Sequence, residues 1–532
     1  MCLAEALLRV PDAETIDDLI QDKIAPHDWG AHVGDSGSLM VNASTWALML
    51  TGRVLDDEED DGVVGALRGM VRRLGEPVIR TAVGRAMREM GSQFVLGRDI
   101  REAMTRARTR EKQGYTYSYD MLGEAARTEA DAMRYHGAYA QAIAAIAAAA
   151  TTGDIRTNPG ISVKLSALHP RYEVAQAGTM LPDLAARTLQ LARAAKDAGI
   201  GFNIDAEEQD RLDLSLDVIE AVLSDPALTG WDGFGVVVQA YGPRAPLVLD
   251  WLYALATRLD RRIMVRLVKG AYWDTEIKRA QVLGLSGFPV FTRKANTDVS
   301  YIANARKLLD MRDRIYPQFA THNAHTVAAI LHMARGDNAK PRAHEETSGT
   351  VNRPAAAGPA AKGGAITGPA TTGGPAITEP SATGGPSAIG PAATDGPASA
   401  GGPTTGPAAR GAAEDTFEFQ RLHGMGEALH DAVLRTHGTR CRIYAPVGAH
   451  RDLLAYLVRR LLENGANSSF VHQIVDDAVA PETIARDPFA HCDAAPNPAI
   501  AHPAAIYGAG RRAAKGWDLT DPRDLSDIET GR

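Results

Sequence analysis

Short apolar runs alternate with amphipathic stretches from about residue 115 onward. The runs predict eight strands, at Tyr115–Asp120, Ile161–Leu165, Phe202–Asp205, Phe234–Gln239, Ile263–Leu267, Pro317–His322, Glu418–His423 and Arg440–Tyr444. Most intervals show helical periodicity, as in Glu124–Ala150 and Leu181–Ala198. Strand–helix alternation implies right-handed crossovers and a parallel sheet, and eight such units favour a closed barrel. The pattern therefore predicts an α/β fold, a (βα)8 TIM-like barrel.

The first 110 residues have a different pattern. Ile79, Val83, Met87 and Met90 recur at three- and four-residue steps, which is typical of one buried helix face. Residues 1–110 are therefore predicted to form an all-helical arm and a small helical domain that precede the barrel.

A low-complexity stretch divides the barrel in the sequence. The barrel is assigned to residues 111–336 and 414–475, and residues 337–413 between them are rich in Gly, Pro, Ala and Thr. Such a stretch buries too little apolar surface to offset the entropy of ordering, so we expect it to be disordered. It joins a helix to a strand, on the face away from the predicted site. Residues 476–532 are a Pro- and Ala-rich tail in which we expect no compact domain.

Polar side chains mark the carboxyl ends of the predicted strands, where barrel enzymes place their chemistry. In chain order they are Asp120, Lys164, Asp205, Gln239, Arg266 with Lys269, His322, Gln420 and Tyr444. Any one of them can be a satisfied polar residue at a strand end. Eight converging ends of this kind favour a shared pocket.

The stretch 266–281, RLVKGAYWDTEIKRAQ, carries the densest chemistry. Arg266 and Lys269 are followed by Gly270 and then by two aromatic residues. Two cations beside Tyr272 and Trp273 suit an anionic or electron-rich planar ligand. The alternative is that the cations only pair with neighbouring carboxylates.

An amphipathic helix is predicted at Asp452–Asn464, with a glycine after it as the stop signal. Arg459 and Glu463 are four residues apart and share a face, and Arg460 is adjacent. Such a pair is usually a surface ion pair worth about 0.2–0.5 kcal/mol. Adjacent arginines can instead form a carboxylate clamp, and both interpretations stay open here.

The amino-acid composition excludes several classes of function. The net charge of −8 and the lack of a Lys/Arg tract argue against nucleic acid as the main partner. Cys2, Cys441 and Cys492 are too few for a disulfide framework or a Cys-based zinc site, and we expect no metal. No apolar run approaches the roughly 20 residues of a membrane span, and no signal peptide is evident. We therefore expect a cytoplasmic protein with at most peripheral membrane contact.

Eight motifs together resemble one family. They are SVKLSALHPRYE (162–173), NIDAEEQDRLDLSLD (203–217), VVQAY (237–241), RLVKGAYWD (266–274), FTRKANTDVSY (291–301), FATHNAHT (319–326), FEFQRLHGMGE (417–427) and RIYAPVGAHRDLLAYLVRRLLENGANSSFV (442–471). Their order and most of their spacing resemble the proline dehydrogenase domain of proline utilization A, a bacterial bifunctional flavoenzyme. The likeness covers most of residues 1–475.

The resemblance implies FAD-dependent oxidation of L-proline to 1-pyrroline-5-carboxylate, the first step of proline catabolism to glutamate. Electrons would pass to a membrane quinone through peripheral contact at the inner membrane. By the same resemblance, the catalytic set is Lys164, Asp205, Arg266 and Tyr444. The implied substrate contacts are Lys164, Leu267, Tyr272, Tyr444, Arg459, Arg460 and Glu463, with the two arginines on the proline carboxylate.

The resemblance also implies a set of FAD contacts, in which Arg266 lies near the flavin N5. The implied contacts are Asp205, Gln239, Arg266, Lys269, Gly270, Ala271, Tyr272, Trp273, Thr292, Lys294, Thr321, His322, Asn323, Gln420, Arg460 and Glu463.

The sequence departs from the family pattern in three respects. It shows no aldehyde dehydrogenase domain after residue 476, no room for a ribbon–helix–helix DNA-binding segment at its start, and the stretch 337–413 is additional. We therefore expect a truncated form with no DNA-binding segment, a partner chain that supplies aldehyde dehydrogenase activity, and a homo-oligomer. Two alternatives stay open: a flavin barrel that acts on a related cyclic or N-substituted amino acid, and an inactive half that binds flavin or a partner.

Overall fold

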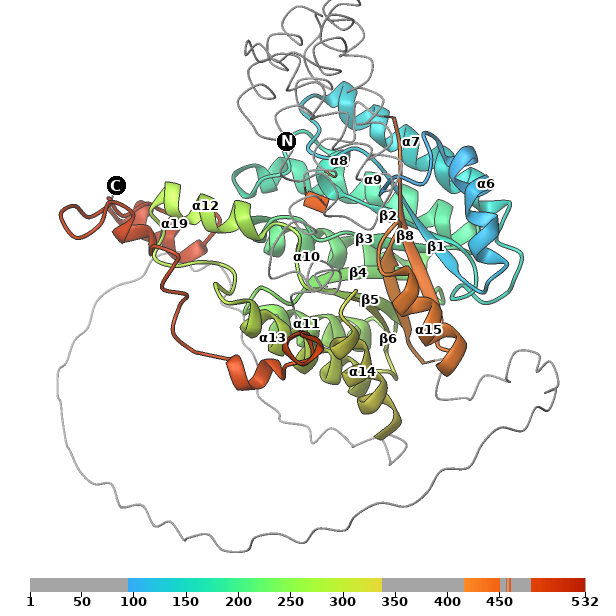
Figure 1. The fold of residues 1–532 in the computed structure, drawn as a ribbon. Coiled ribbons are helices and arrows are strands. Elements are labelled where there is room, and N and C mark those ends of the chain that lie inside the picture. The colour runs from blue at the N-terminus through green and yellow to red at the C-terminus, as the bar shows by residue number, and fades with distance from the viewer. Residues whose placement is uncertain (1–93, 337–415, 450–455, 457–458, 461–479, 532) are drawn as a thin grey trace, which may run out of the picture. The chain divides into compact units, whose positions relative to one another are not determined.

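The structure is a computed structural model that describes residues 94–336, 416–449, 456, 459–460 and 480–531 (Figure 1). The expectations for residues 1–93, for the stretch 337–413 and for most of the helix predicted at Asp452–Asn464, including Glu463, lie outside the described residues.

Eight parallel strands pair in sequence order and close into a barrel, which confirms the predicted fold class (Figure 1). The strands are β1 (Thr116–Met121), β2 (Gly160–Val163), β3 (Gly201–Ile204), β4 (Phe234–Gln239), β5 (Ile263–Val268), β6 (Ile315–Ala320), β7 (Glu418–Leu422) and β8 (Cys441–Val447). The barrel closes between β1 and β8, whose register runs from Thr116 opposite Arg442 to Met121 opposite Val447. Each observed strand overlaps its predicted counterpart, with ends that differ by up to three residues.

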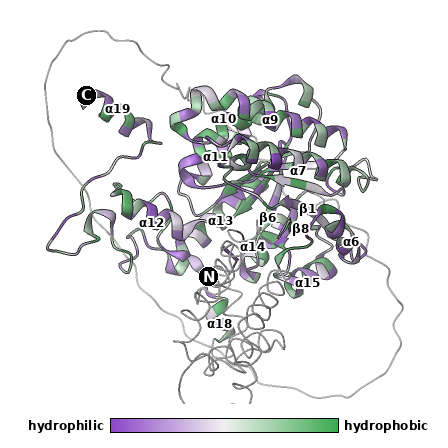
Figure 2. Ribbon diagram, turned by 90° about the horizontal axis from the view of Figure 1, so that it is seen from above, coloured by the Kyte–Doolittle hydropathy of each residue, from purple (hydrophilic) through white to green (hydrophobic). Residues whose placement is uncertain are grey.

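Helices cover the outside of the barrel. They are α6 (Ile100–Glu111), α7 (Glu129–Ala147), α8 (Leu165–Leu168), α9 (Ala177–Asp197), α10 (Leu212–Leu223), α11 (Ala245–Arg258), α12 (Trp273–Leu283), α13 (Lys294–Asp310), α14 (Ala324–Gly336) and α15 (Glu427–His437). Hydrophobic and hydrophilic residues mix along helices such as α9 and α10 (Figure 2), and in α9 the buried side chains include Leu184 and Leu191. Helix α7 begins five residues later than predicted, because Thr128 and Asp131 form a capping box at its start.

The inside of the barrel is polar. Phe419 packs against α15, so its neighbours Glu418 and Gln420 point to the other side of β7, into the barrel. The Glu418 carboxylate accepts hydrogen bonds from Arg442 at 2.8 Å, from Gln318 at 2.9 Å and from Gln420 at 2.8 Å. All four side chains are buried. A buried carboxylate is tolerated because a cation and two amides satisfy it.

Segments on either side of the barrel also contact it. The backbone at Leu96 and Gly97 pairs with β8, and Ala103 and Ala107 of α6 join the main core. Contacts with the barrel thus begin ahead of the boundary placed at residue 110. The tail comprises α18 (Pro481–Ile484), α19 (Pro522–Gly531) and two short 3-10 turns, with backbone and side-chain bonds to the α12–α13 region. No helix among the described residues is long and apolar enough to cross a membrane.

Candidate active site

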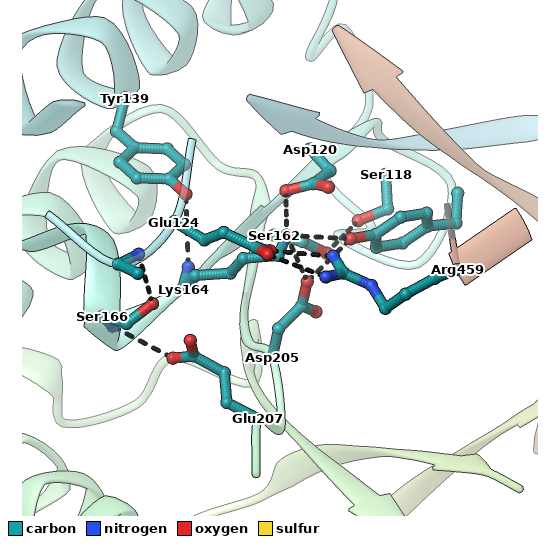
Figure 3. A network of polar contacts seen from close by, with 12 residues as sticks. Ser118, Asp120, Glu124, Tyr139, Ser162, Lys164, Ser166, Asp205, Glu207 and Arg459 are labelled. Carbon is teal, nitrogen blue, oxygen red and sulfur yellow. Dashed lines mark hydrogen bonds and ion pairs between the residues drawn. The ribbon is translucent and has the colours of Figure 1, made fainter. Parts of the chain in front are cut away.

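Lys164 is the centre of a buried polar cluster at the carboxyl ends of β1, β2, β3 and β8 (Figure 3). It follows β2 directly, is 6% exposed, and its Nζ donates to Asp120 at 2.7 Å, to Asp205 at 3.2 Å and to Tyr444 at 3.3 Å. Burial acts to lower the pKa of Lys164, but Asp120, Tyr444 and Asp205 outweigh it and hold that pKa well above its usual value. The ammonium group therefore stays charged.

Arg266, on β5, is the second cation of the cluster. It is 3% exposed, and its Nη1 donates to Asp205 Oδ1 at 2.9 Å. Its Nη2 donates to the hydroxyl oxygens of Ser162 at 3.0 Å and of Ser118 at 3.3 Å. The guanidinium carbon lies 5.1 Å from the centre of the Tyr444 ring. The guanidinium is thus held through two of its three nitrogens and through its contact with the Tyr444 ring, which suits a group that must present its remaining donor in one direction.

Tyr444 completes the set of four predicted catalytic residues, and the structure brings all four together. Its hydroxyl donates to Asp205 Oδ2 at 2.7 Å. Burial, followed by the nearby Asp120 and Asp205 carboxylates, raises the pKa of Tyr444 well above its usual value, so the phenol remains protonated. Asp205 is held by Lys164, Arg266 and Tyr444 at once, which leaves it little freedom to turn.

The arginine pair lies beside this cluster. The Arg459 side chain is 16% exposed and forms a two-point ion pair with Glu124, at 2.7 and 2.8 Å. Its guanidinium carbon lies 5.2 Å from the Tyr272 ring centre. Arg460 is 7% exposed, with its guanidinium carbon 5.2 Å from the ring centre of Tyr456. Neither arginine lies on an exposed helix face, as the surface ion-pair interpretation would require.

Most of the residues predicted to contact FAD lie on β4 to β7 or in the segments that follow these strands. Gln239 donates to the Glu207 carbonyl at 2.8 Å. Lys269 and Lys294 both bind Asp298, the latter at 2.6 Å. Burial acts to raise the pKa of Asp298, but the two ammonium groups lower it below its usual value.

Three further predicted contacts follow β6. The Thr321 hydroxyl accepts from the Asn323 amide at 3.1 Å, and the Asn323 side chain caps α14 by accepting from Thr326 N at 3.1 Å. His322 Nε2 accepts from the Leu422 amide at 3.0 Å. Burial lowers the pKa of His322 to about 3, so the ring is neutral and acts as an acceptor.

The loop after β5 allows a close approach of its backbone. Gly270 has φ +136°, and a Cβ there would lie 2.4 Å from the Tyr241 ring. Ala271 and Tyr272 follow it in the chain. The Trp273 indole donates to the Phe291 carbonyl at 2.8 Å.

Two buried polar atoms of the predicted cofactor-binding residues are available to a bound polar group. Arg266 Nε and Gln420 Oε1 have no hydrogen-bond partner within the part of the chain that the structure describes. Buried polar atoms in folded proteins are nearly always paired, so unpaired ones need an explanation. A flavin ring carries both acceptors and donors along its edge, and these residues fit such a group.

Several residues that build the site were not in the predicted set. Asp120 appeared only as a strand end, and Glu124, Ser118 and Ser162 were not singled out. A signal existed for the two serines: each lies two residues before a predicted polar strand end, and therefore on the same face of its strand.

Comparisons with known proteins show which family the chain is similar to. The family model described as Proline dehydrogenase matches residues 103–348 and 405–473. The bifunctional protein PutA of Escherichia coli is 44% identical over 544 residues, which span 100% of this chain and 36% of that protein. PutA of Rhizobium meliloti is 46% identical over 536 residues, 99% of this chain and 37% of that protein. The crystal structure of a variant of Bradyrhizobium japonicum proline utilization A has a TM-score of 0.66 at 44% identity, and the match covers 99% of this chain and 46% of that one.

A closed parallel barrel with a buried charged cluster at the carboxyl ends of its strands is the architecture of a TIM-like barrel enzyme. The chain belongs to the proline dehydrogenase family. It spans little more than a third of the length of the curated relatives that it matches.

A second family model, described as the DNA-binding domain of Proline dehydrogenase, matches residues 1–94. The expectation that the chain has no DNA-binding segment is therefore wrong. That expectation relied on the absence of a Lys/Arg tract and of a ribbon–helix–helix start, and the match to residues 1–94 overturns it.

Proposed function

We propose that the protein oxidises L-proline to 1-pyrroline-5-carboxylate with bound FAD and passes the electrons to a quinone at the membrane surface. Membership of the proline dehydrogenase family supports this proposal. The single observation that carries it is the placement of Lys164, Arg266 and Arg459 at one end of the barrel, beside unpaired buried polar atoms.

The substrate end of the site is cationic. Arg459 and Arg460 would hold the proline carboxylate, because planar guanidinium groups match a carboxylate with paired hydrogen bonds. By the resemblance, Glu463 would orient the two arginines. Tyr272, which stacks near Arg459, would form a wall of the pocket together with Leu267 and exclude water.

The positive charges have a second effect on a bound amine. The carbon next to the ring nitrogen cannot release hydride while that nitrogen is protonated. Lys164, which stays charged, and the arginine pair disfavour a further cation nearby and would lower the pKa of the substrate amine. Asp205, held by three donors, would keep Lys164 and Arg266 at a fixed distance from each other.

FAD would supply the hydride acceptor that no side chain provides. Arg266, Gln239, Lys269, Lys294, His322 and Gln420 would hold it. Arg266 Nε and Gln420 Oε1 would then gain the partners that they lack. The protein's contribution is to fix the reacting carbon close to the acceptor in an orientation that allows transfer.

The test is spectroscopic. The purified full-length chain, supplied with FAD, should show a flavin spectrum that bleaches on addition of L-proline and recovers with a quinone analogue. A panel that includes hydroxyproline, pipecolate and sarcosine decides the substrate class. Absence of bound flavin would refute the proposal. Bleaching by another amino acid of the panel but not by proline would favour the alternative substrate class.

A further inference from the structure

The tail forms one wall of a cavity beside the predicted cofactor residues. The cavity has a volume of about 180 Å³. Its barrel side includes Lys294, Asp298 and Asn323, at the starts of α13 and α14, and its tail side includes Arg486 and His491. Ligand pockets that enclose a whole drug-sized molecule measure roughly 300–1,000 Å³, so this cavity suits only a part of a dinucleotide.

Specific bonds hold the tail at this position. Asp493 pairs with Arg293 at 3.0 Å, and the Asn296 side chain donates to the Asp493 carbonyl at 2.8 Å. The Asn497 amide donates to the Thr292 hydroxyl at 2.9 Å. Thr292 belongs to the set predicted to contact FAD, so the tail is bonded directly to a predicted cofactor residue.

An apolar contact fixes the tail further along. Ile500 packs in a cluster with Tyr241, Ile277 and Trp273, and Trp273 is another predicted cofactor residue. The tail therefore contacts the cofactor region at several separate points that follow the 3-10 turn Pro488–His491 in the chain.

The charges around the cavity favour an anion. Asp298 is already matched by Lys269 and Lys294. Arg486 adds a further positive charge, and among the described residues no hydrogen bond or ion pair engages its guanidinium. A diphosphate carries two negative charges and several acceptor oxygens, which Lys294 and Arg486 together can satisfy.

We propose that the tail is part of the cofactor site, and that Arg486 binds the diphosphate of FAD from the tail side of this cavity. The inference rests on the proposed function, because it assigns FAD as the ligand. It adds to the cofactor site a segment that follows the last barrel strand in the sequence. It also gives Arg486 a binding role that no catalytic step requires.

The experiment measures how fast FAD leaves the holoprotein, by the fluorescence gained as flavin is released after dilution. Arg486→Met removes the charge but keeps the length of the side chain. Arg512→Met makes the same change at an exposed tail position outside the cavity lining and serves as the matched control. Arg486→Met should release FAD about tenfold faster, near the low end for a hydrogen bond to a charged group because Arg486 is exposed. Added salt should narrow the difference, since it screens exposed charges.

A second variant protects the test against loss of structure. Asp493→Ala breaks the ion pair with Arg293 and loosens the tail without touching the cavity, so it should also speed release. Equal release rates for Arg486→Met and the unsubstituted protein, or equal acceleration by Arg512→Met, would overturn the inference. In that case the proposed function stands if the holoprotein still bleaches with L-proline. If the unsubstituted chain binds no FAD, both proposals fail.

Discussion

Replacing Ser162 with Ala tests whether the two buried serines position Arg266. The substitution removes the acceptor at 3.0 Å from Arg266 Nη2 and leaves Ser118 at 3.3 Å as the remaining acceptor. A hydrogen bond to a charged group contributes about 1.5–3 kcal/mol, and the remaining serine argues for the low end. We therefore expect a loss of about 1.5 kcal/mol in the free energy of unfolding. If the orientation of Arg266 matters equally in the transition state, kcat/KM for proline should fall about tenfold.

The matched control removes another buried hydroxyl. Thr188 is fully buried in α9 and its hydroxyl donates to the Leu184 carbonyl at 2.8 Å. Thr188→Val should cost stability while kcat/KM stays the same. Ser162→Thr retains the hydroxyl and should recover much of the activity. Denaturant unfolding, steady-state kinetics and the flavin reduction potential are the measurements. Unchanged kcat/KM and potential in Ser162→Ala, or the same loss in Thr188→Val, would refute the positioning role.

Three further predictions follow from the site and its surroundings. Arg460→Met should raise KM for proline about tenfold or more with a smaller fall in kcat, because Arg460 is buried next to Tyr456. Unaltered steady-state kinetics would show that Arg460 does not hold the substrate carboxylate. Burial acts to raise the pKa of Glu124, but its bonds to Arg459 lower that pKa below the usual 4.5. The stabilisation from the Glu124–Arg459 ion pair is therefore present above pH 4.5 and is lost as the pH falls through the pKa of the folded state. The difference in Tm between the parent and Glu124→Gln should therefore shrink on acidification below pH 4.5, and a constant difference would contradict this assignment. Deleting residues 340–412 should leave proline turnover nearly unchanged. The described residues on either side of this stretch are the end of α14 and the start of β7, which lie at the opposite end of the barrel from the site. A large fall in kcat with full flavin content would contradict this prediction.

The sequence predicted the barrel because each strand is a local signal. A run such as Phe234–Gln239 is apolar, short and bounded by turn residues, and the observed β4 has the same bounds. The ends were less certain where pairing extends a strand beyond its apolar run. β8 continues to Val447 because it pairs with β1 as far as Met121, and no residue within β8 itself indicates this pairing.

The residues that touch a ligand and the residues that hold them differ in how far they can be predicted. Lys164, Asp205, Arg266 and Tyr444 follow from strand ends and from the family resemblance. Arg459 is bonded to a carboxylate 335 positions earlier in the chain, and the tail is bonded to α13 across about 200 positions. Periodicity and short motifs act over one helix turn or one strand pair, so neither can identify such a partner. The residues that hold the ligand contacts in place are therefore brought together only by the closed barrel. Variants that remove one of these residues test how the fold contributes to the chemistry more directly than variants of the ligand contacts do.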